Sequence, residues 1–204
     1  MIFKAELLAE FIENPDPKDP LVIVPRPNLT ELRESGSASV DLRLGTWFVT
    51  PRQARMSRLD IIKGETTQAQ FTKTSYVPFG SEYYLHPRSF VLGVTLEWVR
   101  LPKDFAGYLV GKSSWGRCGL IVATAVGVHP GFVGCLTLEL SNTGEVPIPV
   151  IPGMAICQLF LHRVETSTDD IDRSRFVGLR QPILGEIKLD EMAQKLAKAY
   201  RVSQ

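Results

Sequence analysis

The apolar residues of this 204-residue chain follow a helical spacing at its start and a strand spacing in its middle. The opening segment, MIFKAELLAEFIE, predicts a short amphipathic helix within residues 1–14, because its apolar side chains recur three and four residues apart. The apolar face would consist of Phe3, Leu7, Leu8, Phe11 and Ile12. The next segment, NPDPKDP, ends this helix because its three prolines cannot continue it.

Residues 20–165 carry short β-rich runs separated by glycines and prolines. The runs are LVIV, SVDLRLG, YYLHP, FVLGVTLEWV, GYLVG, GCLTLELSN and AICQLFLHRV. Many short strands at near-regular spacing are typical of an antiparallel sandwich, a jelly roll or a small barrel. No long helices alternate with them, which argues against a Rossmann-type sheet.

The C-terminal part changes character again, because residues 166–188 are polar and irregular and predict a surface tail. A last helix is predicted from Leu189 to Tyr200, with Leu189, Met192, Leu196 and Tyr200 on one face. We therefore expect one mostly β domain over residues 1–204, with a β core at 20–165 and a helix at each end.

Charge and cysteine usage narrow the classes of function. The chain has 23 lysines and arginines against 22 aspartates and glutamates, so bulk charge favours neither a nucleic-acid nor a membrane partner. Glu6, Glu10 and Glu13 interrupt the opening segment, which argues against a signal peptide, and no apolar run reaches membrane-spanning length. The three cysteines are odd in number and widely spaced, which argues against a disulfide framework and for a reducing cytoplasm. Because they lack CxxC spacing and the chain has three histidines, a zinc site is not expected.

The segment VGCLTLEL carries one carboxylate among leucines. Strand alternation puts Leu136, Leu138 and Leu140 on one face, and Cys135, Thr137 and Glu139 on the other. We expect the leucines to point into the core. Glu139 then faces solvent, a neighbouring subunit or a cleft, and on the strand pattern alone a solvated carboxylate is the plainer interpretation.

A second candidate for chemistry is GKSSWGRCGL, residues 111–120. Ser113 and Ser114 stand between Lys112 and Arg117, so hydroxyls, cationic groups and backbone N–H groups could converge on a phosphate. The order of residues differs from that of a P-loop. Two serines between glycines are also ordinary turn chemistry, so both interpretations stay open.

Four blocks of the sequence, taken in order, resemble the dCTP deaminases of the trimeric dUTPase superfamily. They are SASVDLRLG (37–45), YYLHPRSFVLGVTLEWVRLPKDFAGYLVGKSSWGRCGL (83–120), TAVGVHPGFVGCLTLELSN (124–142) and IPGMAICQLFL (151–161). The resemblance covers most of residues 1–185. It implies a distorted jelly-roll subunit, a homotrimer with active sites between subunits, and a magnesium ion bound through the triphosphate rather than by the protein.

The resemblance also implies roles for single residues. Glu139 stands at the family's catalytic glutamate, and Thr137 and Leu138 stand where strand backbone contacts the base. Asp41 matches an acidic position whose role we interpret as mainly structural. The family's phosphate loop, Arg-Ser-Ser-x-x-Arg, which also supports the reaction centre, corresponds here to Lys112, Ser113, Ser114, Trp115, Gly116 and Arg117.

A metal-free route suits these residues. Hydrolytic deamination needs water delivered to C4 of cytosine and a proton delivered to the departing amine, and one carboxyl group can do both in turn. The zinc deaminases carry H-x-E with P-C-x-x-C, and this chain has neither motif. We therefore expect Glu139 to act as general base, Ser113 to orient the water, and Arg117 to hold Glu139 in its ionised state.

Three departures from the family pattern concern the phosphate loop and the lid. Lys112 replaces an arginine, giving a point charge in place of a bidentate fork, and the segment IVA is one residue shorter than usual and lacks a histidine. The lid, usually similar to Lys-Tyr-Gln-Gly-Gln, reads RFVGL. Arg175 and Phe176 keep its charge and ring as nucleotide-binding candidates, whereas Leu179 cannot replace the polar contact of glutamine, so we expect a weakened lid.

A fourth departure is His129, which stands where the family and the dUTPases have an aspartate. In dUTPases that aspartate activates the water that attacks the phosphate chain. Beside a triphosphate, imidazole favours its protonated form, which has no lone pair to accept a proton. His129 is then a nucleotide-binding candidate without the role of base, and a polar turn residue near the sugar is the plainer alternative.

These observations favour a cytoplasmic, homotrimeric dCTP deaminase that releases dUTP and ammonia, supplies pyrimidine deoxynucleotides and has no nucleic-acid or membrane partner. The first alternative is a dUTP diphosphatase, or a bifunctional enzyme that continues to dUMP. A second alternative, from another class, is a nucleotide-binding regulator that has lost turnover. The changes at Lys112, His129 and Leu179 motivate this regulator, and Glu139 with the intact serine pair argues against it.

Overall fold

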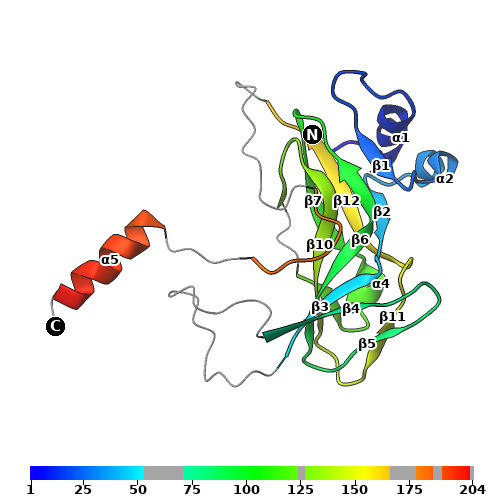
Figure 1. Cartoon of the computed structure of the whole chain (residues 1–204). Coiled ribbons are helices and arrows are strands. Elements are labelled where there is room, and N and C mark those ends of the chain that lie inside the picture. The colour runs from blue at the N-terminus through cyan, green and yellow to red at the C-terminus, as the bar shows by residue number, and fades with distance from the viewer. Residues whose placement is uncertain (53–70, 124–126, 166–177, 186–189, 203–204) are drawn as a thin grey trace.

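The computed structural model describes residues 1–52, 71–123, 127–165, 178–185 and 190–202 (Figure 1). The helices are α1 Ala5–Glu13, α2 Leu29–Glu34, α4 Ser113–Gly116 and α5 Glu191–Val202. The strands are β1 Val22–Val24, β2 Val40–Arg43, β3 Trp47–Pro51, β4 Thr72–Tyr76, β5 Tyr83–Leu85, β6 Phe90–Arg100, β7 Phe105–Gly111, β8 Leu120–Val122, β9 Gly127–Val128, β10 Val133–Asn142, β11 Ile148–Val150 and β12 Ala155–Arg163.

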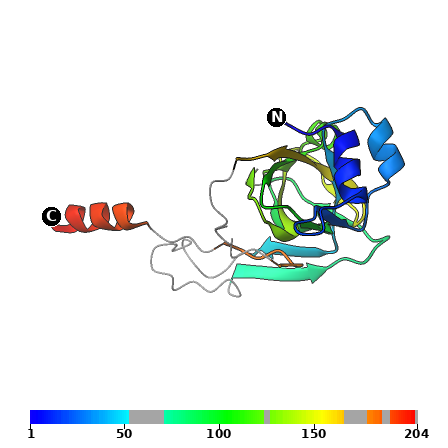
Figure 2. The same cartoon turned by 90° about the horizontal axis from the view of Figure 1, so that it is seen from above.

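Two larger antiparallel sheets form the body of the protein. One has the order β4-β3-β6-β10-β8, with β1 also paired to β6, and the other has the order β2-β12-β7-β9. Strands β5 and β11 form a separate two-stranded sheet. Seen from above, the strands surround the core as a ring, with α1 and α2 packed at one side (Figure 2). The predicted β sandwich or barrel with short helices is confirmed.

The core follows the alternation expected of strands that are buried on one face. In β10 every second residue is buried, beginning with Gly134, and in β12 the inward residues after a bulge are Cys157, Leu159 and Leu161. Each of the seven β-rich runs of the sequence contains a strand of the structure. The elements that the periodicity did not predict are β3, β4, β8, β9, β11, α2 and α4. These are two to six residues long, too short for a periodic signal.

The predicted N-terminal helix is present, but it begins at Ala5, so Phe3 precedes it. Phe3 instead extends the sheet edge, since its N–H donates to the carbonyl of Leu161 at 2.9 Å. Its ring packs against those of Phe11 and Phe105, with centroids 5.3 Å and 4.8 Å away. Edge-to-face and tilted aromatic contacts of this kind anchor the helix on the start of β7.

The C-terminal helix α5 lies within two residues of its predicted position and stands apart from the sandwich in both views (Figures 1 and 2). Met192 and Leu196 of its predicted apolar face are exposed, while Leu189 lies outside the described residues. No helix in the described part of the chain is long and apolar enough to cross a membrane.

A fully buried polar side chain, Asn142, closes the end of β10 next to β5. Its amide nitrogen donates to the carbonyls of Leu85 and Val146, both at 2.8 Å, and its amide oxygen accepts the N–H of Gly144 at 2.8 Å. Three backbone groups, one at the end of β5 and two in the loop before β11, therefore depend on one side chain.

We expect Asn142→Ala to lower the free energy of unfolding by about 2–4 kcal/mol, because it leaves buried backbone groups without partners. Urea denaturation measures this change. Thr143→Ala is the matched control, since the hydrogen bond of Thr143 to the Gly119 carbonyl is exposed and its loss should cost little. Equal losses for the two variants would contradict this role of Asn142.

Candidate active site on strand β10

The face of β10 that carries Glu139 lines a cavity of about 450 Å³. Leu138 and Leu140 are fully buried and Leu136 nearly so, while Cys135, Thr137 and Glu139 are half-buried, as the alternation predicted. Phe90, Leu92 and Leu109 add apolar surface to the cavity, and His129 joins Thr137 and Glu139 as its polar residues. This volume and this mostly apolar lining with a few polar groups are typical of small-molecule sites.

The Glu139 carboxylate has no hydrogen-bond or ion-pair partner among the residues that the structure describes. Its backbone is fixed on both sides: the residue pairs with Leu92 of β6, and its carbonyl accepts the N–H of Ala123 at 2.8 Å. A half-buried carboxylate that is held by its backbone and unpaired at its side chain is available to a ligand as base or acceptor.

The outer edge of β10 has a gap beside this carboxylate. The gap lies at residues 136–138. After it, Leu140–Asn142 pair with β8, and before it, Val133 and Cys135 form backbone hydrogen bonds with residues 178 and 179 of the C-terminal segment. No strand of the described structure pairs with Leu136–Leu138 on this edge. Because the side chain of Leu138 is fully buried, only its backbone can contact a ligand.

His129 lies in the turn between β9 and β10 and is exposed at the cavity. Its carbonyl accepts the N–H of Phe132 at 3.2 Å, which closes the turn, and Phe132 in turn bonds through its carbonyl to the N–H of Leu101 at 2.9 Å. The turn therefore holds the imidazole in the same cavity as Glu139.

The phosphate-loop candidates lie elsewhere on the single chain. Helix α4 is one short turn that follows β7, and it is anchored by the Trp115 indole, whose Nε1 donates to the carbonyl of Ala155 at 2.9 Å. Ser113, Ser114, Gly116 and Arg117 are exposed, and none of them lines the cavity of Glu139. The structure therefore does not bring the loop and Glu139 together within one chain.

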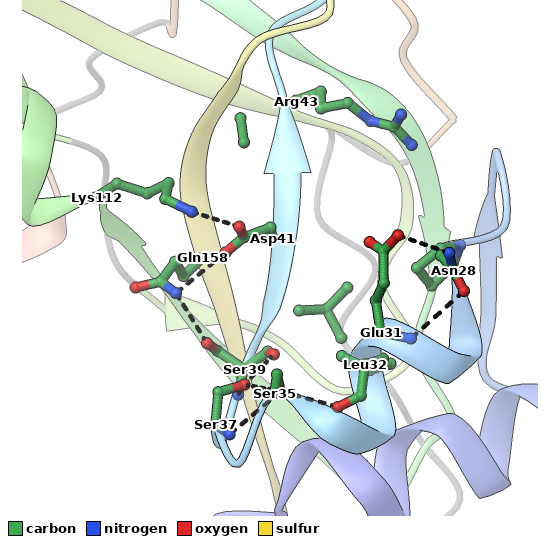
Figure 3. A pocket seen from close by; sticks show the side chains of 13 residues that line it. Asn28, Glu31, Leu32, Ser35, Ser37, Ser39, Asp41, Arg43, Lys112 and Gln158 are labelled. Atoms are coloured by element: carbon green, nitrogen blue, oxygen red, sulfur yellow. Dashed lines mark hydrogen bonds and ion pairs between the residues drawn. The ribbon is translucent and has the colours of Figure 1, made fainter.

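Lys112 borders a second cavity, of about 480 Å³, between α2, β2 and β12. There its ammonium forms an ion pair with Asp41, whose other carboxylate oxygen accepts from Gln158 Nε2 at 3.1 Å. Figure 3 shows both side chains directed at Asp41, with Gln158 also donating to Ser39 Oγ at 3.2 Å. Asp41 thus orients Lys112, which refines its expected structural role.

Sequence reasoning missed Gln158. Its signal was the single polar residue within the otherwise apolar run AICQLFL. The Lys112 ammonium keeps donors beyond the one directed at Asp41 and lies next to the exposed serine loop, whereas the Gln158 amide is engaged by Asp41 and Ser39.

A C-terminal segment also borders the first cavity. The N–H of Gly178 donates to the carbonyl of Val133 at 2.6 Å, and the N–H of Cys135 donates to that of Leu179 at 2.9 Å. Gly134 allows this approach: its φ is 142°, and a Cβ there would lie 3.2 Å from the nitrogen of Gly178. Leu179, predicted to lose a polar side-chain contact, uses its backbone here, while Arg175 and Phe176 lie outside the described residues.

Beyond this anchor, Ile183, Leu184 and Gly185 line the cavity of Glu139. The sequence predicted only a surface tail here, because a polar segment without periodicity carries no signal for such pairing.

Cys135 is the thiol that lines the cavity. Burial raises the pKa of Cys135, and the nearby Glu97 adds to this effect while Arg180 opposes it. The thiol therefore stays protonated near neutral pH and is a poor nucleophile. The carboxylate of Glu139 is the better candidate for chemistry in this cavity.

No group of three or more histidine, cysteine, aspartate or glutamate side chains in the described ranges could hold a metal ion. Of the carboxylates that line the second cavity, Asp41 is engaged by Lys112 and Gln158, and Glu31 accepts from Asn28 Nδ2 at 2.8 Å. These residues fit an ion carried by a ligand's phosphates and water better than an ion held by the protein alone.

Comparison with known proteins gives consistent matches. A family model described as dCTP deaminase-like matches residues 21–164. A dCTP deaminase, dUMP-forming, of Methanobrevibacter smithii is 32% identical over 200 residues, which is 95% of this chain and 99% of that protein. A protein of the same name from Parafrankia is 45% identical over 152 residues, 71% of this chain and 74% of that protein.

One solved structure has a similar fold. The crystal structure of a 2'-deoxycytidine 5'-triphosphate deaminase from Agrobacterium tumefaciens aligns with a TM-score of 0.58 at 20% identity. The alignment covers 80% of this chain and 46% of the other, so this chain spans less than half the length of that structure. The likeness concerns the fold alone.

Proposed function

The chain belongs to the dCTP deaminase-like family, and from this premise we propose that it hydrolyses the C4 amino group of dCTP. One observation carries the proposal: the unpaired, half-buried carboxylate of Glu139 on the wall of a mostly apolar cavity. A cytosine ring fits such a cavity because its faces are apolar and its edge needs only a few polar contacts.

In this mechanism Glu139 serves both proton transfers. Its carboxylate takes a proton from water as the oxygen attacks C4, and it then passes that proton to the amine as the C4–N bond breaks. Water and cytosine give uracil and ammonia, so no oxidant or cofactor enters the balance. Ser113 would orient the water, and Arg117 would hold the Glu139 carboxylate in place by charge.

The gap in the edge of β10 supports backbone recognition of the base at Thr137 and Leu138. The backbone groups of β10 that face this gap can read the hydrogen-bonding edge of a pyrimidine, while the Phe90 and Leu92 side chains contact its faces. The N–H of Leu136 is not among them, because it donates to the Thr95 hydroxyl. Such contacts explain selection of a pyrimidine by strand backbone rather than by long polar side chains.

The exposed loop supports a site shared between copies of the chain. Ser113, Ser114 and Arg117 are exposed and absent from the cavity of Glu139, so a second copy would supply them, as in a closed trimer. The triphosphate would then lie against Lys112 and Gln158 of that copy. Magnesium fits as an ion held by phosphate oxygens and water, where it neutralises phosphate charge.

The product of the proposed reaction is dUTP, because His129 suits binding better than base catalysis. The imidazole is broader and longer than the aspartate of the dUTPases and would place the water differently, and Glu139 would lie at the base end of the nucleotide. The second candidate product is dUMP, which the names of the Methanobrevibacter and Parafrankia proteins favour.

We expect Glu139→Gln to reduce deamination of dCTP by more than about a thousandfold while dCTP binding persists, because the amide accepts no proton. Steady-state kinetics and calorimetric binding measure the two effects. Glu145→Gln is the control, since that carboxylate is exposed on the turn before β11. Near-normal turnover of pure Glu139→Gln protein would remove Glu139 from the mechanism.

Mixing two inactive variants tests the shared site. Glu139→Gln and Arg117→Ala proteins should each be inactive alone. After joint unfolding and refolding in equal amounts, about a quarter of the sites should combine an intact Glu139 with an intact Arg117 from the neighbour, and activity should return in proportion. Refolded single variants are the controls. A mixture as inactive as its components would mean that one chain supplies both residues.

The product distinguishes the two candidate reactions. With dCTP and magnesium, we expect chromatography to show dUTP accumulating without dUMP, and added dUTP should release no pyrophosphate. His129→Asp should introduce some release of pyrophosphate from dUTP, because an aspartate is an anionic base at the same turn. Rapid release of pyrophosphate from dUTP by the unmodified protein would establish dUMP as the product and make His129 the candidate base.

A further inference from the structure

Strand β6 is irregular where it faces the catalytic part of β10. Cys135 pairs with Trp98, but Thr137 pairs with Val94, so β10 advances two residues while β6 advances four. An unbroken ladder would have placed Glu139 opposite Val94, whereas it pairs with Leu92. The irregularity thus moves Glu139 along β6 by two residues, roughly 7 Å, without changing the face on which it lies.

A side chain replaces the missing backbone partner at this point. The hydroxyl of Thr95, 1% exposed, accepts the N–H of Leu136 at 2.9 Å and donates to the carbonyl of Glu97 at 2.9 Å. Thr95 thus holds Leu136, which directly precedes Thr137, and the side chain of Thr137 lines the cavity. Thr95 itself does not line the cavity.

The irregular stretch of β6 is anchored on the opposite sheet. The Glu97 carboxylate, 2% exposed, accepts the backbone N–H of Arg43 at 2.7 Å and the Arg43 Nε at 2.8 Å. Next to it, Leu44 forms a bridge with Thr95. Contacts from both sheets therefore hold the Thr95 hydroxyl that bonds to Leu136. The ion pair with Arg43 is also needed by Glu97 itself, because a charge this deeply buried is costly without a partner.

We propose that Thr95 is a positioning residue for the deamination: it fixes the register of β10 and so the place of Glu139 against the base. This inference rests on the proposed function. It differs from a merely structural role because a displaced base lowers turnover in folded protein, and a misplacement of about 1 Å can cost roughly a hundredfold.

Thr95→Val and Thr95→Ser separate the two roles. Valine keeps the shape and removes the hydroxyl, so kcat for dCTP should fall about 10- to 100-fold as Glu139 is displaced. KM should change less, because the Lys112 and serine-loop residues proposed to bind the triphosphate are untouched. Serine keeps the hydroxyl and should retain kcat, although its lost methyl group lowers the melting temperature. Leu8→Val, in buried α1, is the stability control: it should lower the melting temperature and leave kcat unchanged.

If Thr95→Val does not fold, Thr95→Cys replaces it, since sulfur fills the space but accepts a hydrogen bond weakly. The inference predicts a lowered kcat for cysteine and a retained kcat for serine. Valine or cysteine protein with the kcat of serine protein would overturn it. Absence of dCTP deamination by the unmodified protein is a different outcome, which would overturn the proposed function and this inference with it.

Discussion

A buried hydroxyl and a buried carboxylate on β6 determine how the two sheets meet. Thr95 bonds to the peptide of Leu136 on β10, and Glu97 bonds to the backbone and side chain of Arg43 on β2. A buried carboxylate is costly unless it is fully paired, so the irregular stretch of β6 and the end of β2 must keep one geometry. The candidate site inherits that geometry, because the Leu136 that Thr95 holds lies on β10, the strand that carries Thr137 and Glu139.

Much of this architecture could be predicted from the order of residues. Alternation along VGCLTLEL predicted the buried leucines correctly and put Glu139 on the opposite face, because a strand repeats every two residues. It left open whether that face meets solvent, a neighbouring subunit or a cleft. The shift of register could not be predicted, because it depends on bonds such as that between Thr95 and Leu136, which are 41 residues apart. Gln158 and the cavity-lining residues 183–185 were missed for the same reason: their roles come from tertiary contacts without a local signature.

The distribution of polar groups explains why one chain looks incomplete as an enzyme. Glu139 and His129 share one cavity, whereas Lys112 is paired with Asp41 at another and the serine loop faces outward. A nucleotide has an apolar ring at one end and a highly charged chain at the other. A site divided between two copies lets each end meet a different chemical environment, and it couples catalysis to assembly.

The central claim is that Glu139 meets the base while a neighbouring copy meets the phosphates. A crystal structure of Glu139→Gln protein with dCTP and magnesium tests this most directly, because it locates both ends of the nucleotide at once. The account predicts the C4 amino group beside residue 139, the ring against Phe90 and Leu92, and the triphosphate on the serine loop of another subunit. A triphosphate beside residue 139, or a nucleotide held by one chain alone, would contradict it.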